Sequence, residues 1–115
     1  MTPNSLPPAR RIRRRVEYQR VFDAGRRAHG RYLTIIAAPG EGPLSRLGIV
    51  ASRKIGGAVA RNRAKRLIRQ VFRTEPIPAA AADLVVIAKP AAVDAGAADV
   101  ARDYRVTLKR LGLSK

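Results

Sequence analysis

Two periodic patterns meet in residues 47–72, which read LGIVASRKIGGAVARNRAKRLIRQVF. The first six residues, LGIVAS, are mostly apolar and include β-branched side chains, a composition typical of a strand. After Gly56 and Gly57 the apolar side chains recur every three or four residues, and this spacing predicts a helix over residues 58–73. The apolar face of this helix consists of Ala60, Ala64, Leu67, Ile68 and Val71. The segment therefore predicts a strand followed by an amphipathic helix.

The predicted helix carries basic side chains that no acidic side chain offsets. Residues 46–73 contain nine Lys and Arg and no Asp or Glu. Arg61, Lys65 and Arg69 recur at a spacing of four, where each pair of like charges costs roughly a few tenths of a kcal/mol. Arg61 also lies near the positive end of the helix dipole, which disfavours cations there. Phosphate groups would turn each of these unfavourable electrostatic interactions into a favourable one, so the helix is predicted to bind nucleic acid. The alternative is a basic face that is in contact with solvent only.

The composition points the same way and excludes several other classes of protein. The chain has 115 residues, 24 Lys and Arg against 8 Asp and Glu, and a formal net charge of +16. Such a charge opposes a compact fold unless a polyanion neutralises it. The length suits one small domain, and 46% hydrophobic residues suffice for a core. The chain has no cysteine, no apolar run long enough to cross a membrane and no signal-like apolar segment near its start, which together favour the cytoplasm.

Upstream of residue 47 we expect a helix and one strand of a β-hairpin. Helical spacing relates Val16, Tyr18, Val21 and Phe22. This helix would end at Gly25. The segment YLTIIAA, residues 32–38, is predicted to be a strand, and the turn-rich residues 39–45 would join it to the strand at 47–52 as a hairpin. A short extended piece at residues 26–29 is expected to add an edge strand.

Downstream of the basic helix we expect one more strand and one more helix. The segment LVVIA, residues 84–88, is apolar on both faces, as a central strand covered on both sides would be. Asp94 is a plausible N-cap for the last helix. The core positions expected in that helix are Ala97, Val100, Ala101, Tyr104, Leu108 and Leu111. The order helix, hairpin, helix, strand, helix predicts an α/β domain (an α+β sandwich) with a mixed sheet of three or four strands. This single RNA-binding domain would span residues 10–112 after a flexible tail at residues 1–9.

The same segment resembles the bacterial ribonuclease P protein component. That family has a strand, a Ser-basic-basic turn, a Gly-containing link and an Arg-Asn-Arg helix, and Ser52-Arg53-Lys54 matches the turn. The helix matches position by position in Arg61-Asn62-Arg63-x-Lys65-Arg66-x-x-Arg69. Weaker matches lie in Ile12-x5-Tyr18-x2-Val21-Phe22-x2-Gly25 and in Val86-Ile87-Ala88-Lys89-Pro90. The resemblance covers about residues 10–110.

The resemblance implies a function and a departure from an ordinary fold rule. It implies the protein subunit of ribonuclease P, a ribonucleoprotein endonuclease that hydrolyses precursor tRNA to release its 5′ leader. The catalytic RNA carries the chemistry and binds Mg²⁺, so no catalytic residue, metal or cofactor is expected in the protein itself. The implied partners are the ribonuclease P catalytic RNA and precursor tRNA, with no membrane and no small-molecule substrate. It also implies a left-handed β-α-β crossover, whereas about 98% of such crossovers are right-handed.

The resemblance places residues on two RNA-binding surfaces. Those expected to bind the catalytic RNA are Arg53, Lys54, Arg61, Asn62, Arg63, Lys65, Arg66 and Arg69. Those expected to line the cleft for the 5′ leader are Tyr18, Phe22, Tyr32, Ile36 and Lys89. Tyr18 and Phe22 are four residues apart on one helix face beside arginines, as in stacking platforms for single-stranded RNA, and both rings being core is the alternative. Ile36 stands where the family tends to place an aromatic ring, and Tyr32, on the same face by strand alternation, is a possible substitute.

The residues themselves indicate no active site. The eight acidic residues are scattered, so they do not form the carboxylate cluster that a two-metal nuclease requires. His29 is the only histidine, and no nucleophile paired with a base is identifiable. Rival functions are a ribosomal RNA-binding protein, a helix-turn-helix DNA-binding protein and an independent nuclease. The helix-turn-helix reading needs two adjoining short helices, whereas strands are predicted on both sides of the basic helix.

Overall fold

The structure is a computed structural model that describes residues 10–40, 42, 44–74 and 81–113. The tail expected at residues 1–9 lies outside the described residues. The elements in chain order are α1 (Arg15–Ala24), β1 (Arg26–His29), β2 (Leu33–Pro39), β3 (Arg46–Val50), the 3₁₀ turn η2 (Arg53–Ile55), α2 (Ala58–Thr74), β4 (Ala82–Ala88), the 3₁₀ turn η3 (Pro90–Val93) and α3 (Ala97–Arg110).

The strands form one mixed sheet in the order β1-β2-β4-β3. β2 pairs antiparallel with β1 and with β4, and β3 pairs parallel with β4. The edge strand expected at residues 26–29 and the central strand expected at residues 84–88 are both confirmed. The expected hairpin between the segments at 32–38 and 47–52 is wrong, because β4 lies between them.

The chemistry of β4 and of the loop after β2 explains this arrangement. Leu84 and Val85 face opposite sides of the sheet and are both 0% exposed, so β4 buries most apolar surface in a central position. Gly40 and Ser45, at the two ends of this loop, both contact the beginning of β4. The Gly40 N–H donates to the Ala81 carbonyl at 3.3 Å, and the Ser45 hydroxyl accepts from the Ala82 N–H at 3.1 Å. These contacts hold the beginning of β4 beside the end of β2.

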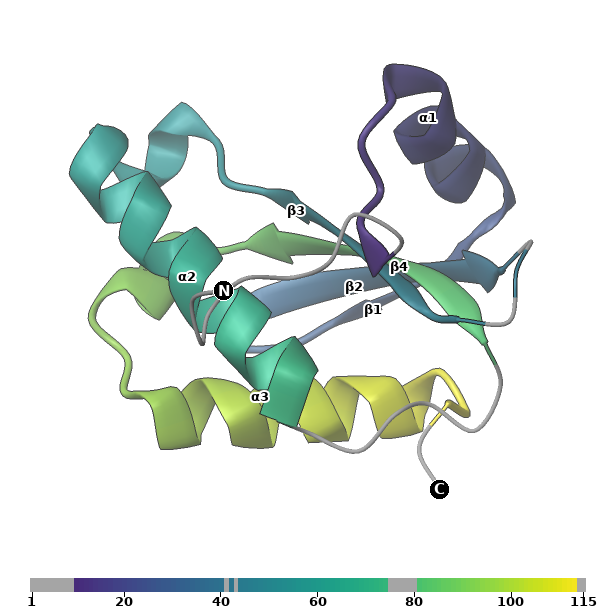
Figure 1. The fold of residues 1–115 in the computed structure, drawn as a ribbon. Coiled ribbons are helices and arrows are strands. Elements are labelled where there is room, and N and C mark those ends of the chain that lie inside the picture. Colours follow the sequence, from purple (N-terminus) through teal and green to yellow (C-terminus); the bar gives the residue numbers. More distant parts are fainter. Residues whose placement is uncertain (1–9, 41, 43, 75–80, 114–115) are drawn as a thin grey trace.

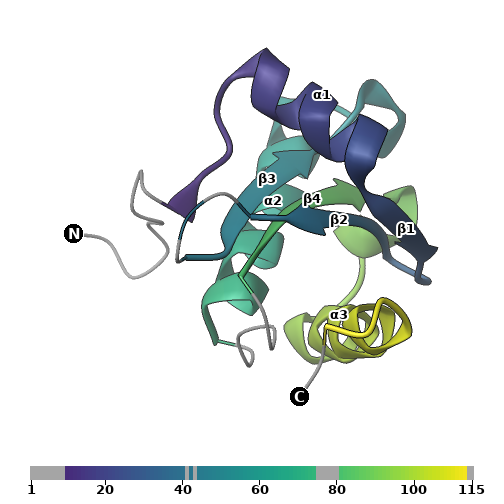
Figure 2. The same ribbon diagram turned by 90° about the vertical axis from the view of Figure 1, so that its right-hand side faces the viewer.

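The helices cover the two faces of the sheet unequally. α1 lies on one face, and α2 and α3 lie on the other (Figures 1 and 2). With α2 toward the viewer and the parallel strands pointing up, β4 lies to the left of β3 (Figures 1 and 2). The β3-α2-β4 crossover is therefore left-handed, as the resemblance implies and against the general rule.

Each face of the sheet has its own core. The larger cluster lies under α2 and α3 and includes Leu33, Ile35, Ile68, Leu84, Val86 and Tyr104. The smaller cluster lies under α1 and contains Ile12, Val21, Ile36, Ala38 and Val85. Alternate residues of β2 and β4 enter different clusters, as the period of two in a strand requires.

The last helix begins later than the sequence suggests. Asp94 is exposed and follows η3, and the N-cap residue of α3 is Gly96 rather than Asp94. Pro90 begins the 3₁₀ turn that delays the helix. Val100, Tyr104 and Leu108 are buried as expected.

Candidate nucleic-acid interface

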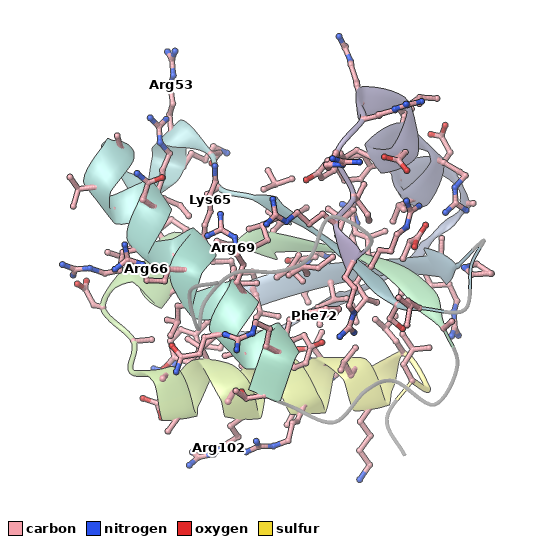
Figure 3. The ribbon with its side chains drawn as sticks, viewed as in Figure 1. Arg53, Lys65, Arg66, Arg69, Phe72 and Arg102 are labelled. Atoms are coloured by element: carbon pink, nitrogen blue, oxygen red, sulfur yellow. The ribbon has the colours of Figure 1, made fainter. Side chains whose placement is uncertain are left out.

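The basic side chains of α2 form the first candidate surface. The first turn of α2 contains no acidic residue. Lys65 and Arg69 lie on the side of α2 that faces β3 and the N-terminal segment, whereas Arg66 points away from the sheet (Figure 3). Within the described ranges, the side-chain ion pairs join arginines of α1 and β3 to carboxylates and involve no cation of α2. The positive charge of α2 is thus left without a carboxylate partner in the part of the chain that the structure describes.

The turn before α2 adds two more cations to this surface. The Ser52 hydroxyl accepts a hydrogen bond from the Lys54 N–H at 3.3 Å and so shapes the 3₁₀ turn η2. Gly56 follows with φ 138°, a backbone conformation that favours glycine. Arg53 and Lys54 are exposed, and Arg53 extends away from the body of the protein (Figure 3). Together with the exposed Asn62, all eight residues expected to bind the catalytic RNA belong to η2 and α2.

Tyr18 and Phe22 form the second candidate surface. Both rings are half-buried on the sheet side of α1, where they pack against the smaller cluster with the equally half-buried Val50 and Ile87. The rings are therefore neither fully core nor fully solvated. Such rings can support a base that stacks on their exposed part.

The position of Tyr18 depends on a glycine in β3. A Cβ atom at Gly48 would lie 2.7 Å from Cε1 of Tyr18, so the ring rests directly on the strand where a side chain is missing. Burial raises the pKa of Tyr18, and a hydrogen bond with the Ile49 backbone opposes this shift. The phenol end of the ring is consequently in contact with β3.

A buried carboxylate in β4 holds α1 on the sheet. Asp83 is 1% exposed and makes two contacts with Arg46 of β3, at 3.0 Å from Nε to Oδ1 and 2.7 Å from Nη2 to Oδ2. Asp83 also pairs with Arg20 of α1. Arg46 in turn reaches Glu17 of α1, with Nη1 to Oε2 at 2.6 Å. The acidic residues are scattered along the sequence, so this network was not predicted, although an aspartate beside the apolar run LVVIA could have signalled a buried ion pair.

Glu17 also closes the first turn of α1. Its Oε1 accepts hydrogen bonds from the backbone N–H groups of Arg14 at 3.0 Å and Arg13 at 3.2 Å. The Arg14 hydrogen bond and the Arg46 side chain lower the pKa of Glu17 from its usual 4.5 to about 2. Asp83 and Glu17 together raise the pKa of Arg46. The carboxylates near α1 therefore serve to orient this helix.

Of the other three residues expected in the leader cleft, Ile36 lies in the cluster against which Tyr18 and Phe22 pack, and Lys89 lies just after the end of β4. Ile36 is 1% exposed beneath α1 and belongs to the smaller cluster. Lys89 follows the end of β4, and its Nζ donates to the carbonyl of Gly30.

The expectation that Tyr32 shares a face with Ile36 is wrong, because Tyr32 packs against the larger cluster on the opposite side of the sheet. β2 begins only at Leu33, so strand alternation does not extend back to Tyr32. The turn before β2 is held by Asp103 of α3, whose carboxylate accepts from the Arg31 N–H at 2.9 Å and the Tyr32 N–H at 2.8 Å.

The donor set of the described residues does not fit a metal ion. No three His, Cys, Asp or Glu side chains come together within residues 10–40, 42, 44–74 and 81–113. Glu17 and Asp83 are already paired with arginines. In the same part of the chain, no helix has the length and apolar character needed to cross a membrane.

Comparisons with known proteins agree on one family. The family model described as Ribonuclease P matches residues 6–112. The ribonuclease P protein component of Syntrophus aciditrophicus is 37% identical over 107 residues, covering 92% of this chain and 90% of the relative. That of Desulfovibrio desulfuricans is 44% identical over 101 residues, covering 84% of this chain and 76% of the relative.

Solved structures of ribonuclease P proteins share the fold. The protein of Staphylococcus aureus superposes with a TM-score of 0.81 at 30% identity, covering 92% of this chain and 98% of the other. The protein of Thermotoga maritima gives a TM-score of 0.77 at 30% identity, covering 87% of this chain and 96% of the other.

Proposed function

The chain belongs to the family of ribonuclease P protein components, the protein subunits of the ribonucleoprotein endonuclease that matures tRNA 5′ ends, and we propose that it binds the catalytic RNA through α2 and the 5′ leader of precursor tRNA beside α1. The observation that carries this proposal is the positive charge of α2, which no carboxylate among the described residues pairs, together with the half-buried rings of α1 on the other face of the sheet. A ribosomal protein would need the first surface but not the second.

The α2 surface suits the phosphate backbone of the RNA subunit. Arg61, Arg63, Lys65, Arg66 and Arg69 are spaced so that phosphates on two sides of the helix can be neutralised. Asn62, which is exposed between two arginines, can hydrogen-bond a base or sugar. Arg53 and Lys54 extend the same surface at the N-terminal end of α2.

The α1 surface suits a single-stranded leader. Tyr18 and Phe22 offer stacking surface over the sheet, and Lys89 lies two residues after Ile87 at the end of β4 and supplies a cation there. Mature tRNA lacks the leader, so this surface would distinguish precursor from product. The protein contributes affinity and charge screening, while the RNA subunit holds Mg²⁺ and carries the hydrolysis. The domain at residues 10–112 acts in the cytoplasm, where precursor tRNA is made.

Salt-dependent binding tests the α2 surface. Arg66→Ala removes a cation that points away from the sheet, whereas Arg102→Ala removes one from the exposed side of α3, away from α2, and serves as the matched control (Figure 3). We expect Arg66→Ala to weaken binding to the catalytic RNA and to lower the slope of log affinity against log salt by about 0.7–0.9 for the lost phosphate contact. Arg102→Ala should leave that slope unchanged. Equal slopes for both variants would contradict the assignment of α2.

Tyr18→Ala tests the α1 surface in the assembled holoenzyme. We expect a loss of about 1–3 kcal/mol, the value of one base stack, in affinity for precursor tRNA. Affinity for mature tRNA should not change. An equal loss for both tRNAs would refute the role of Tyr18 in leader binding.

A further inference from the structure

A small pocket opens at the outer edge of β3, between the N-terminal segment and α2. β3 is an edge strand of the sheet, and among the described residues its outer edge is bridged by the N-terminal backbone at Leu47, where the Ile12 N–H donates to the Leu47 carbonyl at 2.9 Å. Beyond this bridge the chain leaves the sheet to form α1, and Tyr18 of that helix returns to the edge at the Ile49 backbone. This edge and the adjacent side of α2 border an open pocket of about 190 Å³.

The pocket combines apolar walls with cations. Ile12, Tyr18 and Ile49 supply the apolar walls, and Lys65, Arg69 and the exposed Arg11 supply the positive charge. Lys65 and Arg69 are half-buried, and their side chains make no hydrogen bond or ion pair with any residue in the described part of the chain. Partial removal of two cations from water without a carboxylate partner is unfavourable, so an anionic group is the missing counterpart.

The volume limits what the occupant can be. Pockets for drug-sized ligands begin at about 300 Å³, so 190 Å³ is too small for a large organic molecule. It equals the space of about six water molecules at roughly 30 Å³ each, which suits one planar heterocyclic ring. A nucleotide has both required parts, a ring that can lie against Tyr18 and Ile49 and a phosphate that can reach Lys65 and Arg69.

We propose that this pocket takes one unpaired nucleotide of the catalytic RNA, with its base against Tyr18, Ile12 and Ile49 and its phosphate at Lys65 and Arg69. The inference rests on the proposed function, because Lys65 and Arg69 belong to the helix assigned to that RNA. It goes further than the proposed function, in which α2 binds the phosphate backbone of the RNA, because it assigns the recognition of one unstacked base to the edge of β3. The pocket lies beside the leader surface and shares only Tyr18 with the rings assigned to it.

Isoleucine methyl NMR of the full chain tests the proposal directly. Ile12 and Ile49 line the pocket, Ile87 reports on the leader surface, and the fully buried Ile35 and Ile68 are internal references. We expect the catalytic RNA to shift the methyl signals of Ile12 and Ile49, and a leader oligoribonucleotide alone to shift that of Ile87. A saturated complex with the catalytic RNA in which Ile12 and Ile49 keep their free positions would overturn the proposal, as would a shift of the Ile49 methyls caused by the leader alone.

A variant that fills the pocket gives an independent readout. Ile49→Phe adds bulk at the wall without changing charge, and Val106→Phe makes the same kind of addition at an exposed position of α3 as a control. We expect Ile49→Phe to weaken binding to the catalytic RNA about five- to 150-fold, the loss of one base stack. If the wild-type chain binds the RNA and Ile49→Phe binds equally well, the pocket assignment fails while the proposed function stands. If the wild-type chain does not bind the RNA at all, the proposed function itself fails. The methyl spectra of the wild-type chain keep the test valid even if Ile49→Phe does not fold.

Discussion

Asp83→Asn should separate the anchoring of α1 from the rest of the protein. The substitution keeps the size of the side chain and removes the charge that pairs with Arg46 and Arg20. Breaking a buried ion pair costs about 3–5 kcal/mol because the remaining charge is left without a partner. Arg46 and Arg20 retain 22% and 31% exposure and can recover some hydration, so we expect a loss of about 2–3 kcal/mol in the free energy of unfolding.

The functional effect should be confined to the leader surface. α1 carries Tyr18 and Phe22, whereas the catalytic RNA is assigned to α2, on the other face of the sheet. Loosening α1 should therefore weaken affinity for precursor tRNA and leave that for mature tRNA unchanged, and any loss in binding to the catalytic RNA should be limited to the contact at Tyr18. Denaturant unfolding measures the loss of stability. Equilibrium binding to the holoenzyme and to the RNA subunit measures the changes in affinity.

The control must carry the same change in charge, because one acidic group fewer strengthens every long-range attraction to RNA. Asp94→Asn provides it, since Asp94 is exposed and follows η3. We expect Asp94→Asn to unfold like the wild type. If Asp83→Asn unfolds within about 0.5 kcal/mol of Asp94→Asn, the buried network does not hold α1, and the reasoning is refuted.

Three further outcomes follow from the same geometry. The pKa of Glu17 is about 2 in the folded protein against a usual 4.5, so its contribution to stability is complete above about pH 4.5 and is lost as the pH falls toward 2. Urea unfolding across this range should show a shallower pH dependence for Glu17→Gln than for the wild type, and identical curves would contradict the assigned contacts. Gly48→Ala places a Cβ atom 2.7 Å from Tyr18, so it should displace the ring and reduce affinity for precursor tRNA, whereas Gly96→Ala, with open space around the new atom, should not. Gly25→Ala would put a Cβ atom 2.8 Å from Cγ2 of Ile36 and should destabilise the protein by about 1–3 kcal/mol in denaturant unfolding, and wild-type stability would disprove this close packing.

The sequence predicted best where one local pattern was sufficient. The apolar face of α2 is set by residues three and four apart, so Ala64, Ile68 and Val71 were predicted and are buried. β4 is apolar on both faces, and its central place followed from that alone. The strand at residues 26–29 was also predicted, although it is short and mostly exposed.

The sequence failed where partners lie far apart in the chain. β2 and β3 are separated by a turn-rich loop typical of a hairpin, and only the later β4 decides that they do not pair. Asp83 is 63 residues from Arg20 and 37 from Arg46, so no local pattern relates their charges. Tyr32 was assigned to the wrong face because alternation was extended past the residue where the strand begins.

The handedness of the β3-α2-β4 crossover could not come from local physics. The general rule favours a right-handed connection, and the left-handed expectation came only from the resemblance carried by the Arg-Asn-Arg helix. The views of the structure agree with that expectation (Figures 1 and 2).

Reconstituted cleavage of precursor tRNA tests the central claim most directly. The reaction would contain the full chain alone, bacterial ribonuclease P RNA alone at low Mg²⁺, or both together. We expect only the mixture to cut and to produce the mature 5′ end, because the chain supplies leader affinity and charge screening while the RNA supplies the chemistry. If the chain cuts without RNA, or adds nothing to the RNA while binding ribosomal RNA fragments tightly, the account is contradicted.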